Sequence, residues 1–270
     1  MSAVVNATAN TGISGAAIHA RCAASAAHVA IEVLAETGSS NADLLARAAA
    51  LPGPTLLIAL QQSAGRGRAG RAWLSEPGAT LMFSLAWRFK GPLQQLVGLP
   101  LAVGVALAET LTALSVPVRL KWPNDLIKDD GKLAGILVET LAGADGAVWA
   151  VVGVGLNLLM PDRLESQIGR GVAAAPWLAQ MDRNDLMAQL LNRLAATLAE
   201  FDDTGFAAFS ERWNRLHAHH GRDVKILDRG QVLHRGVARG VDDSGRLLLD
   251  TPQGRVAVLS GDVSLRSAEE

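Results

Sequence analysis

The chain has 270 residues, of which 49% are apolar, and its 25 basic residues almost cancel its 26 acidic ones. That length allows one large domain plus a small one, and the composition excludes both a disordered chain and a broadly basic nucleic-acid-binding protein. Cys22 is the only cysteine, which excludes an internal disulfide and a cysteine-based zinc site and favours a cytoplasmic protein. We expect no membrane segment, because the most apolar stretch, residues 96–111, contains Pro100 and Glu109 and is typical of a buried helix.

The first half of the chain predicts strands and helices in alternation. Residues 1–27 lack periodicity and a targeting signal, so we expect a flexible tail there that includes at most one helical turn. Continuous apolar runs predict buried strands, and small polar residues before an apolar run predict a helix start. In chain order we expect strands at 29–37, 54–62, 79–89 and 118–122, and helices beginning at 38–41 and spanning 96–114.

The second half predicts two long strands, two helices and then a change of character. The strands cover 132–141 and 147–159, with a turn at 143–146, and the helices cover 184–202 and 204–217. The last fifty residues are short β runs separated by glycine-containing turns, which is typical of a small β-barrel. We therefore predict a tail at 1–27, a large domain at 28–218 and a C-terminal β-domain at 219–270.

The most unusual segment is QSAGRGRAGRAW, residues 62–73, with three glycines and three arginines within seven residues. Glycine lets a backbone approach a ligand closely, and arginine offers planar cationic forks for phosphate or carboxylate, so the segment predicts an anion site. Its glycines also form a G-x-G-x-x-G pattern. We reject the dinucleotide-binding interpretation, because a strand follows where that motif requires a helix. A solvated turn remains the alternative.

A second segment, KWPNDLIKDDGKLAGILVE at residues 121–139, places polar groups after a strand. Pro123 predicts a bend that leaves Asn124 and Asp125 at the strand's carboxyl end, where Asp125 suits Mg²⁺. Lys132 begins the next strand and is expected at the same edge, while Gly135 inside that strand marks a close approach. The alternative is a polar hairpin loop, which we accept for Lys128, Asp129 and Asp130.

Two shorter segments are weaker signals. GSSN, residues 38–41, can hold a neutral polar group such as a ureido ring, although helix capping explains it equally well. GVGLN, residues 153–157, has two glycines in a strand, which indicates either backbone crowded against a ligand or a bulge.

In order and spacing, these four segments resemble the signature segments of the biotin protein ligases. The resemblance covers residues 29–216, and the pair GRGR-x-GR-x-W and KWPNDL with KLAGILVE is the specific part. It implies an α+β fold: a mixed β-sheet catalytic domain flanked by helices, of the class II synthetase-like type, followed by a small SH3-like β-barrel. Ser40 stands where the family often has threonine, which keeps the hydroxyl.

The resemblance also implies roles for individual residues. Arg68, Lys132, Asp125 and Lys121 are expected to be catalytic, with Asp125 as a ligand of Mg²⁺. The expected contacts to biotin and its adenylate are Ser39, Ser40, Asn41, Gln62, Arg66, Gly67, Arg68, Trp73, Trp122, Lys132, Gly135 and Asn157.

The implied activity uses ATP to convert biotin into biotinyl-5′-AMP and then transfers biotin to a lysine of a biotin carboxyl carrier protein, a part of acetyl-CoA carboxylase or another carboxylase. Some family members carry an N-terminal DNA-binding domain. Fewer than thirty residues precede the first expected strand here, so we expect no DNA partner and no repressor role, and either a monomer or a homodimer. The alternatives are a lipoate protein ligase, a non-catalytic binding module and a nucleic-acid-binding protein.

Overall fold

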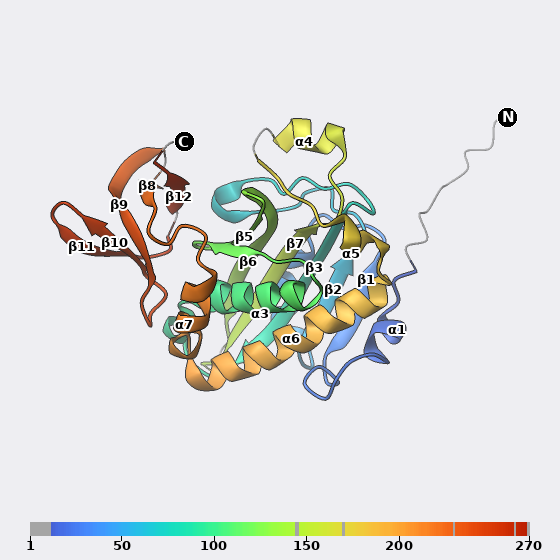
Figure 1. Ribbon diagram of the computed structural model, residues 1–270. Helices are drawn as coiled ribbons and strands as arrows, with labels where there is room; N and C mark the ends of the chain where they lie inside the picture. The colour runs from blue at the N-terminus through green and yellow to red at the C-terminus, as the bar shows by residue number, and fades with distance from the viewer. Residues whose placement is uncertain (1–11, 144–145, 169–170, 229, 262, 269–270) are drawn as a thin grey trace.

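The protein consists of a seven-stranded mixed sheet with helices on both faces and a separate five-stranded antiparallel sheet at the C-terminal end (Figure 1). The computed structural model describes residues 12–143, 146–168, 171–228, 230–261 and 263–268. The large sheet has the order β1-β2-β3-β7-β6-β5-β4, in which only β1 and β2 are parallel. Its strands are β1 (Ala30–Leu34), β2 (Thr55–Ala59), β3 (Thr80–Phe89), β4 (Arg119–Lys121), β5 (Asp125–Lys128), β6 (Gly131–Ala142) and β7 (Val148–Asn157).

The helices fall into two layers. On one face of the sheet lie the long helices of the core (Figure 1), and on the other lies α2 with the glycine-rich segment. The α-helices are α1 (Gly15–His19), α2 (Ser40–Arg47), α3 (Leu99–Ala113), α4 (Asp162–Ile168), α5 (Pro176–Gln180), α6 (Arg183–Thr204) and α7 (Ala207–Leu216). The 3-10 turns are η1 (Ala48–Ala50), η2 (Arg68–Gly70) and η3 (Leu93–Leu96).

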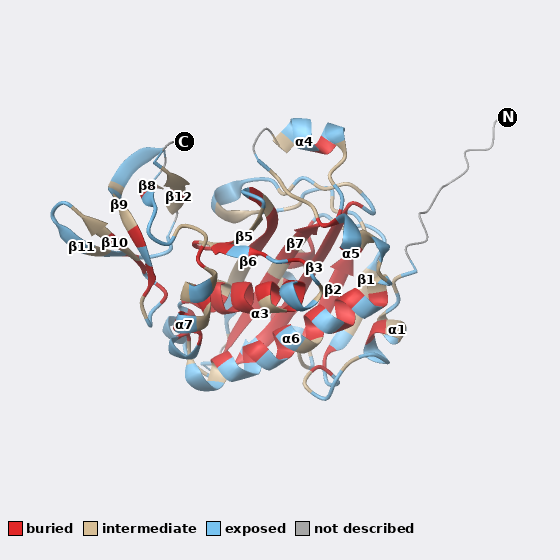
Figure 2. Cartoon of the chain, viewed as in Figure 1, coloured by how far each residue is buried: buried red, intermediate tan, exposed pale blue. Residues whose placement is uncertain are grey.

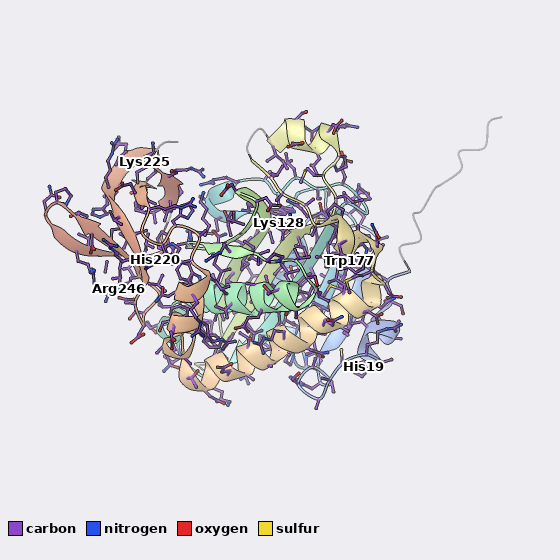
Figure 3. All side chains as sticks on the ribbon, viewed as in Figure 1. His19, Lys128, Trp177, His220, Lys225 and Arg246 are labelled. Atoms are coloured by element: carbon purple, nitrogen blue, oxygen red, sulfur yellow. The ribbon has the colours of Figure 1, made fainter. Side chains whose placement is uncertain are left out.

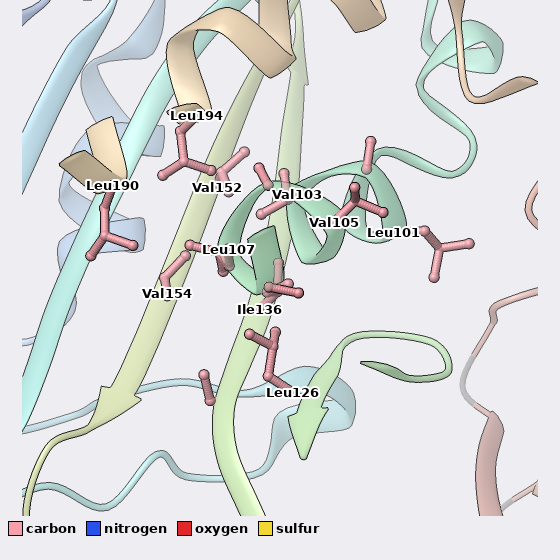
Figure 4. Close-up of a cluster of buried hydrophobic side chains, with 14 of the residues drawn as sticks. Leu101, Val103, Val105, Leu107, Leu126, Ile136, Val152, Val154, Leu190 and Leu194 are labelled. Atoms are coloured by element: carbon pink, nitrogen blue, oxygen red, sulfur yellow. The ribbon is translucent and has the colours of Figure 1, made fainter. Parts of the chain in front are cut away.

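Side chains along each central strand alternate between these two layers. In β3, Phe83 and Leu85 enter the main core beneath α3 and α6, whereas Ala86 packs on the opposite face against Leu44 of α2. Successive side chains of a strand point to opposite faces, so this core fixes the orientation of every neighbouring strand. Figure 4 shows the main core, with Val103 of α3 beside Val152 of β7.

Helix α3 is almost entirely apolar and lies largely buried inside the protein. Eleven of its fifteen residues are buried (Figure 2), as expected for a helix packed between the sheet and α6. The segment Leu93–Ala113 is long and apolar enough to cross a membrane, but 72% of its most apolar window is buried within the protein. The predicted buried helix at 96–114 is therefore confirmed.

The C-terminal sheet has the order β11-β10-β9-β8-β12, so β11 and β12 are its edges and the pairing is that of an open sheet instead of a closed barrel. Its strands are β8 (Asp223–Asp228), β9 (Gln231–Val241), β10 (Leu247–Thr251), β11 (Gly254–Val258) and β12 (Val263–Ser267). Buried residues such as Val224 and Leu247 belong to the same hydrophobic cluster as the large sheet. The domain boundary at 218/219 remains a prediction.

At the N-terminus the structure shows more tertiary packing than the expectation of a flexible tail. Residues 12–27 contain the short helix α1, which agrees with the expected helical turn, but its Ile18 is fully buried. Asn184 of α6 accepts a hydrogen bond from the Ser14 amide at 2.9 Å and donates one to the Gly12 carbonyl at 3.0 Å. The segment is ordered by these distant partners, which its own composition does not reveal. The rest of the expected tail, residues 1–11, lies outside the described residues.

Candidate functional site

A hollow in the middle of the large sheet results from small residues at alternating positions. On the α2 face, Ser84 of β3 pairs with Gly153 of β7, and Gly155 of β7 pairs with Gly135 of β6. The pairing of β7 with both neighbours is continuous here, so its two glycines do not mark a bulge. Because side chains on this face are short or absent, the sheet forms the floor of a pocket.

Most of the predicted binding residues line this pocket, which has a volume of about 470 Å³. They come from the start of α2, from the segment after β2 and from β6, three parts of the chain that meet only in the folded protein. The predicted residues on its wall are Ser39, Ser40, Asn41, Gln62, Arg66, Gly67, Arg68, Trp73, Lys132 and Gly135.

One end of the pocket is a buried network of uncharged polar groups. Gln62 Oε1 accepts from the Ser40 amide at 2.7 Å, and Ser40 Oγ lies 2.7 Å from Ser84 Oγ. Ser84 Oγ donates to Asn41 Oδ1 at 2.6 Å. Ser39 caps α2 by accepting from the Ala42 amide, so the capping and pocket interpretations of the GSSN segment both hold for it. Such an array suits a ligand group that both donates and accepts hydrogen bonds.

The Trp73 indole lies across the glycines of the floor. A Cβ at Gly155 would lie 2.3 Å from the Trp73 ring, and one at Gly135 would lie 2.9 Å from it. The close approach expected from these glycines therefore comes from this side chain. The buried Trp73 Nε1 lies over Gly155 and has no hydrogen-bond partner among the described residues.

The other end of the pocket is cationic. Lys132 Nζ lies 2.5 Å from Asp125 Oδ1 and 5.5 Å from the centre of the Trp73 ring. Arg68 donates to Asn124 Oδ1 at 3.0 Å and to the Gly261 carbonyl, while Arg66 forms an ion pair with Glu139. Arg68 and Lys132 thus lie at this end of the pocket, while Arg66 lies with Glu139 beside the polar end. Three cationic side chains on the wall of one pocket favour the anion-site interpretation of the glycine-rich segment over a solvated turn.

A second pocket of about 660 Å³ adjoins the first, and Arg68, Trp73 and Lys132 belong to both. It is lined by the predicted residues Lys121, Trp122 and Asp125 and, from the C-terminal sheet, by residues 263–266 of β12. The two pockets together offer a neutral polar end, a cationic centre and a wider outer chamber. That order suits a neutral polar ring, an anionic reacting centre and a larger nucleotide.

Two predicted residues have structural contacts that the sequence does not indicate. Trp122 is 1% exposed, and its Nε1 donates to the Gly245 carbonyl at 3.2 Å, so it joins the large sheet to the C-terminal sheet. Asn157 lies outside the first two pockets. Its amide donates to the carbonyls of Lys132 and Ala173 at 3.2 and 3.3 Å, beside a further pocket that Trp73 also lines.

Several lining residues were absent from the predicted set. Ser84 lies in a strand that reads as uniformly buried, so only its position over the glycines shows its role. Asn124 lines both pockets, and Glu139 contacts the lining residues Asn41 and Arg66 without lining either pocket. Both belong to the second signature segment, and their polar character inside or beside strands was an available signal. The β12 residues gave none, because nothing in the sequence predicts that this strand lies beside Arg68.

The acidic groups of the site are few. Among the described residues no three His, Cys, Asp or Glu side chains come together as a metal-binding group. Asp125 is the carboxylate beside the cationic wall, and one carboxylate is enough for Mg²⁺ when phosphate oxygens and water complete its coordination.

Comparisons with known proteins agree with this geometry. Residues 30–157 match the Biotin/lipoate A/B protein ligase family, and residues 219–266 match the Biotin protein ligase C terminal domain. The chain is 38% identical over 247 residues to the bifunctional ligase/repressor BirA of Escherichia coli, covering 89% of this chain and 75% of that protein. It is also 38% identical to a biotin–[acetyl-CoA-carboxylase] ligase of Mycobacterium tuberculosis, covering 86% of this chain and 88% of that protein.

A solved structure supports the same assignment. The biotin protein ligase of Aquifex aeolicus in complex with biotin and ATP superposes with a TM-score of 0.73 at 28% identity, covering 88% of this chain and 99% of that one. Together with the polar pocket and its cationic wall, these likenesses show that the chain belongs to the biotin protein ligases and is an ATP-dependent ligase.

Proposed function

We propose that this chain activates biotin as biotinyl-5′-AMP within the two adjoining pockets and transfers the biotinyl group to a lysine of a biotin carboxyl carrier protein. The observation that carries the proposal is the junction of a neutral polar end with a cationic wall. A ureido ring donates two hydrogen bonds and accepts at its oxygen, which matches the network of Ser40, Asn41 and Gln62.

In the first step, a biotin carboxylate oxygen attacks the α-phosphorus of ATP and pyrophosphate leaves. Both reactants are anions, so fixed positive charge at their meeting point is the main source of catalysis. Arg68 and Lys132 line both pockets and Arg66 lines the inner one, and we assign this charge to them with Lys121 at the outer chamber. Mg²⁺ would arrive with the phosphates, with Asp125 as its protein ligand.

In the second step, the uncharged carrier lysine attacks the acyl carbon of the adenylate and AMP leaves. The mixed anhydride hydrolyses if water reaches it. The segment of residues 62–73 forms one wall of both pockets, and we propose that it keeps water out. The names of the ligases from Mycobacterium tuberculosis and Paracoccus denitrificans support the carrier of acetyl-CoA carboxylase as the acceptor.

We further propose a cytoplasmic enzyme, monomeric or homodimeric, that does not bind operator DNA. In the described part of the chain before β1, the single helix α1 packs on α6 and forms no helix-turn-helix.

Pyrophosphate exchange into ATP tests the activation step, because it requires reversible adenylate formation. We expect exchange that depends on biotin and that falls in variants of Arg68, Asp125 and Lys132. Lipoic acid serves as the matched control in calorimetric titration. Its dithiolane ring has no hydrogen-bond donors, so it would leave the buried polar groups of the pocket unpaired. Exchange with lipoate but not with biotin would overturn the proposal.

A further inference from the structure

Glu139 is a charged residue of β6 whose carboxylate contacts both the polar end of the pocket and the glycine-rich segment. Its Oε2 accepts from Asn41 Nδ2 at 2.9 Å, and its Oε1 forms the ion pair with Arg66. The alternation of β6 places it on the same sheet face as Gly135 and Leu137, which line the pocket. Glu139 itself is not among the described residues that line either of the two adjoining pockets, so its contacts are with the lining side chains Asn41 and Arg66.

We propose that Glu139 is a positioning residue that sets the direction of the hydrogen bonds in the pocket and anchors Arg66. This inference rests on the proposed biotin-binding function of the same pocket. It assigns to Glu139 a role in biotin recognition without contact to biotin.

The first step of the argument concerns the Asn41 amide. Oxygen and nitrogen of an amide can exchange places by a rotation, and their partners decide which orientation is stable. A carboxylate only accepts, so Glu139 requires the nitrogen of Asn41 to face it. The same nitrogen donates to the Leu137 carbonyl at 3.3 Å, which uses both of its hydrogens. Asn41 Oδ1 is thereby turned towards Gly153 and the pocket.

The second step follows the hydrogen bonds away from Asn41. Once Oδ1 faces Ser84, the Ser84 hydroxyl donates its single hydrogen to it at 2.6 Å. In the contact between Ser84 and Ser40 at 2.7 Å, Ser40 is then the donor, and its hydrogen is shared between Ser84 Oγ and Gln62 Oε1 at 3.1 Å. The fixed carboxylate thus determines the direction of the hydrogen bonds from Asn41 to Ser84. The result is an acceptor, Asn41 Oδ1, with one lone pair left for a ligand N–H.

The third step concerns Arg66. The segment around it is a small hairpin, with a bridge between Arg66 and Ala72 and a hydrogen bond from the Gly67 amide to the Arg71 carbonyl at 2.7 Å. The Arg66 side chain is 43% exposed, so its ion pair with Glu139 contributes little to global stability. It does attach the hairpin to β6, and the same carboxylate therefore touches both the binding network and the covering segment.

Two substitutions separate these roles. Glu139→Gln keeps an oxygen that can accept from Asn41 but loses the charge for Arg66, whereas Glu139→Ala removes both partners. The matched control is Glu32→Gln, because Glu32 of β1 pairs with Arg47 at 3.0 Å far from the pocket and is 38% exposed. Calorimetry gives the biotin dissociation constant, and limited trypsin digestion reports cleavage within residues 66–71.

We expect Glu139→Ala to weaken biotin binding about tenfold, because Asn41 loses the partner that orients it. Glu139→Gln should recover most of that loss, and both variants should be cleaved faster than the parent within residues 66–71, with a melting temperature like that of Glu32→Gln. Parental biotin affinity in Glu139→Ala, or equal weakening in both variants together with a lowered melting temperature, overturns the inference. A parent protein that binds no biotin contradicts the proposed function instead.

Discussion

At the scale of single residues, the site depends on the absence of a side chain at Gly153 of the sheet. Gly153 leaves room for the Asn41 amide, since a Cβ there would lie 2.3 Å from Asn41 Oδ1. The strand on either side is paired and cannot move away easily. The glycine is therefore required by the side chain above it and not by its own backbone conformation.

Gly153→Ala should displace Asn41 and weaken biotin binding by about tenfold or more, while the fold is retained. Calorimetric titration with biotin measures this effect, and far-UV circular dichroism checks the fold. Gly53→Ala is the control, because a Cβ at Gly53 meets nothing within 4 Å. Equal affinity in the two variants would show that the crowding at Gly153 is relieved without cost.

Arg68 links the glycine-rich segment to two other parts of the protein, Asn124 after β4 and the Gly261 carbonyl before β12. Arg68→Gly should loosen this wall and release biotinyl-5′-AMP at least about tenfold faster, because a fixed guanidinium and its hydrogen bonds are lost together. Chromatography of free adenylate after a single turnover measures the release. Arg68→Lys keeps the charge but not the planar guanidinium. It should release the adenylate at a rate between those of the parent protein and Arg68→Gly. Retention of the adenylate by Arg68→Gly would contradict the proposed role.

At the scale of elements, the turn between β9 and β10 attaches the C-terminal sheet. Gly245 in that turn has φ +75°, and a Cβ there would lie 3.0 Å from Leu101 Cδ1 and 3.1 Å from the Gly98 Cα. Its carbonyl also accepts the Trp122 bond, and Ser210 of α7 donates to Asp243 at 2.7 Å.

Gly245→Ala should lower the free energy of unfolding by about 1–3 kcal/mol, from backbone strain plus the displaced contact. Gly221→Ala is the matched control, since Gly221 has φ +73° but open space around its Cα. Chemical denaturation measures both, and hydrogen exchange in β8–β12 shows whether the sheet loosens first. If the two variants lose the same stability, the packing of the turn contributes nothing beyond strain.

At the scale of the whole molecule, a buried histidine lies where the large sheet meets the C-terminal sheet. His217 is 3% exposed and packs against Trp213, with the ring centres 4.7 Å apart. Neither of its ring nitrogens has a hydrogen-bond partner among the described residues. Burial, with the nearby His219 and His220, lowers the pKa of His217 from 6.5 to about 3. Figure 3 shows His220 at this junction, and Arg119, Asp129, Asp130 and Arg222 line the adjacent pocket.

This lowered pKa makes stability depend on pH in a definite direction. The unfolded chain binds a proton at His217 below pH 6.5 and the folded chain does not until about pH 3. The free energy of unfolding should therefore be highest above pH 6.5 and fall as the pH drops between these values, by on the order of 1 kcal/mol per pH unit. Thermal unfolding from pH 8 to 4 measures it. His217→Phe should flatten the slope, and an unchanged slope would show that other groups cause it.

The sequence by itself determined the buried helix, most long strands and the chemistry of the site, because apolar periodicity and polar residues in glycine-rich segments are local properties. Tertiary structure alone decided that residues 12–27 pack on α6, that Trp122 joins the two sheets and that β12 forms a wall of the outer pocket. It also decided that the Glu139 carboxylate contacts both Asn41 and Arg66. These contacts join residues 73 to 193 positions apart, and the pairing of strands that creates them depends on the whole core.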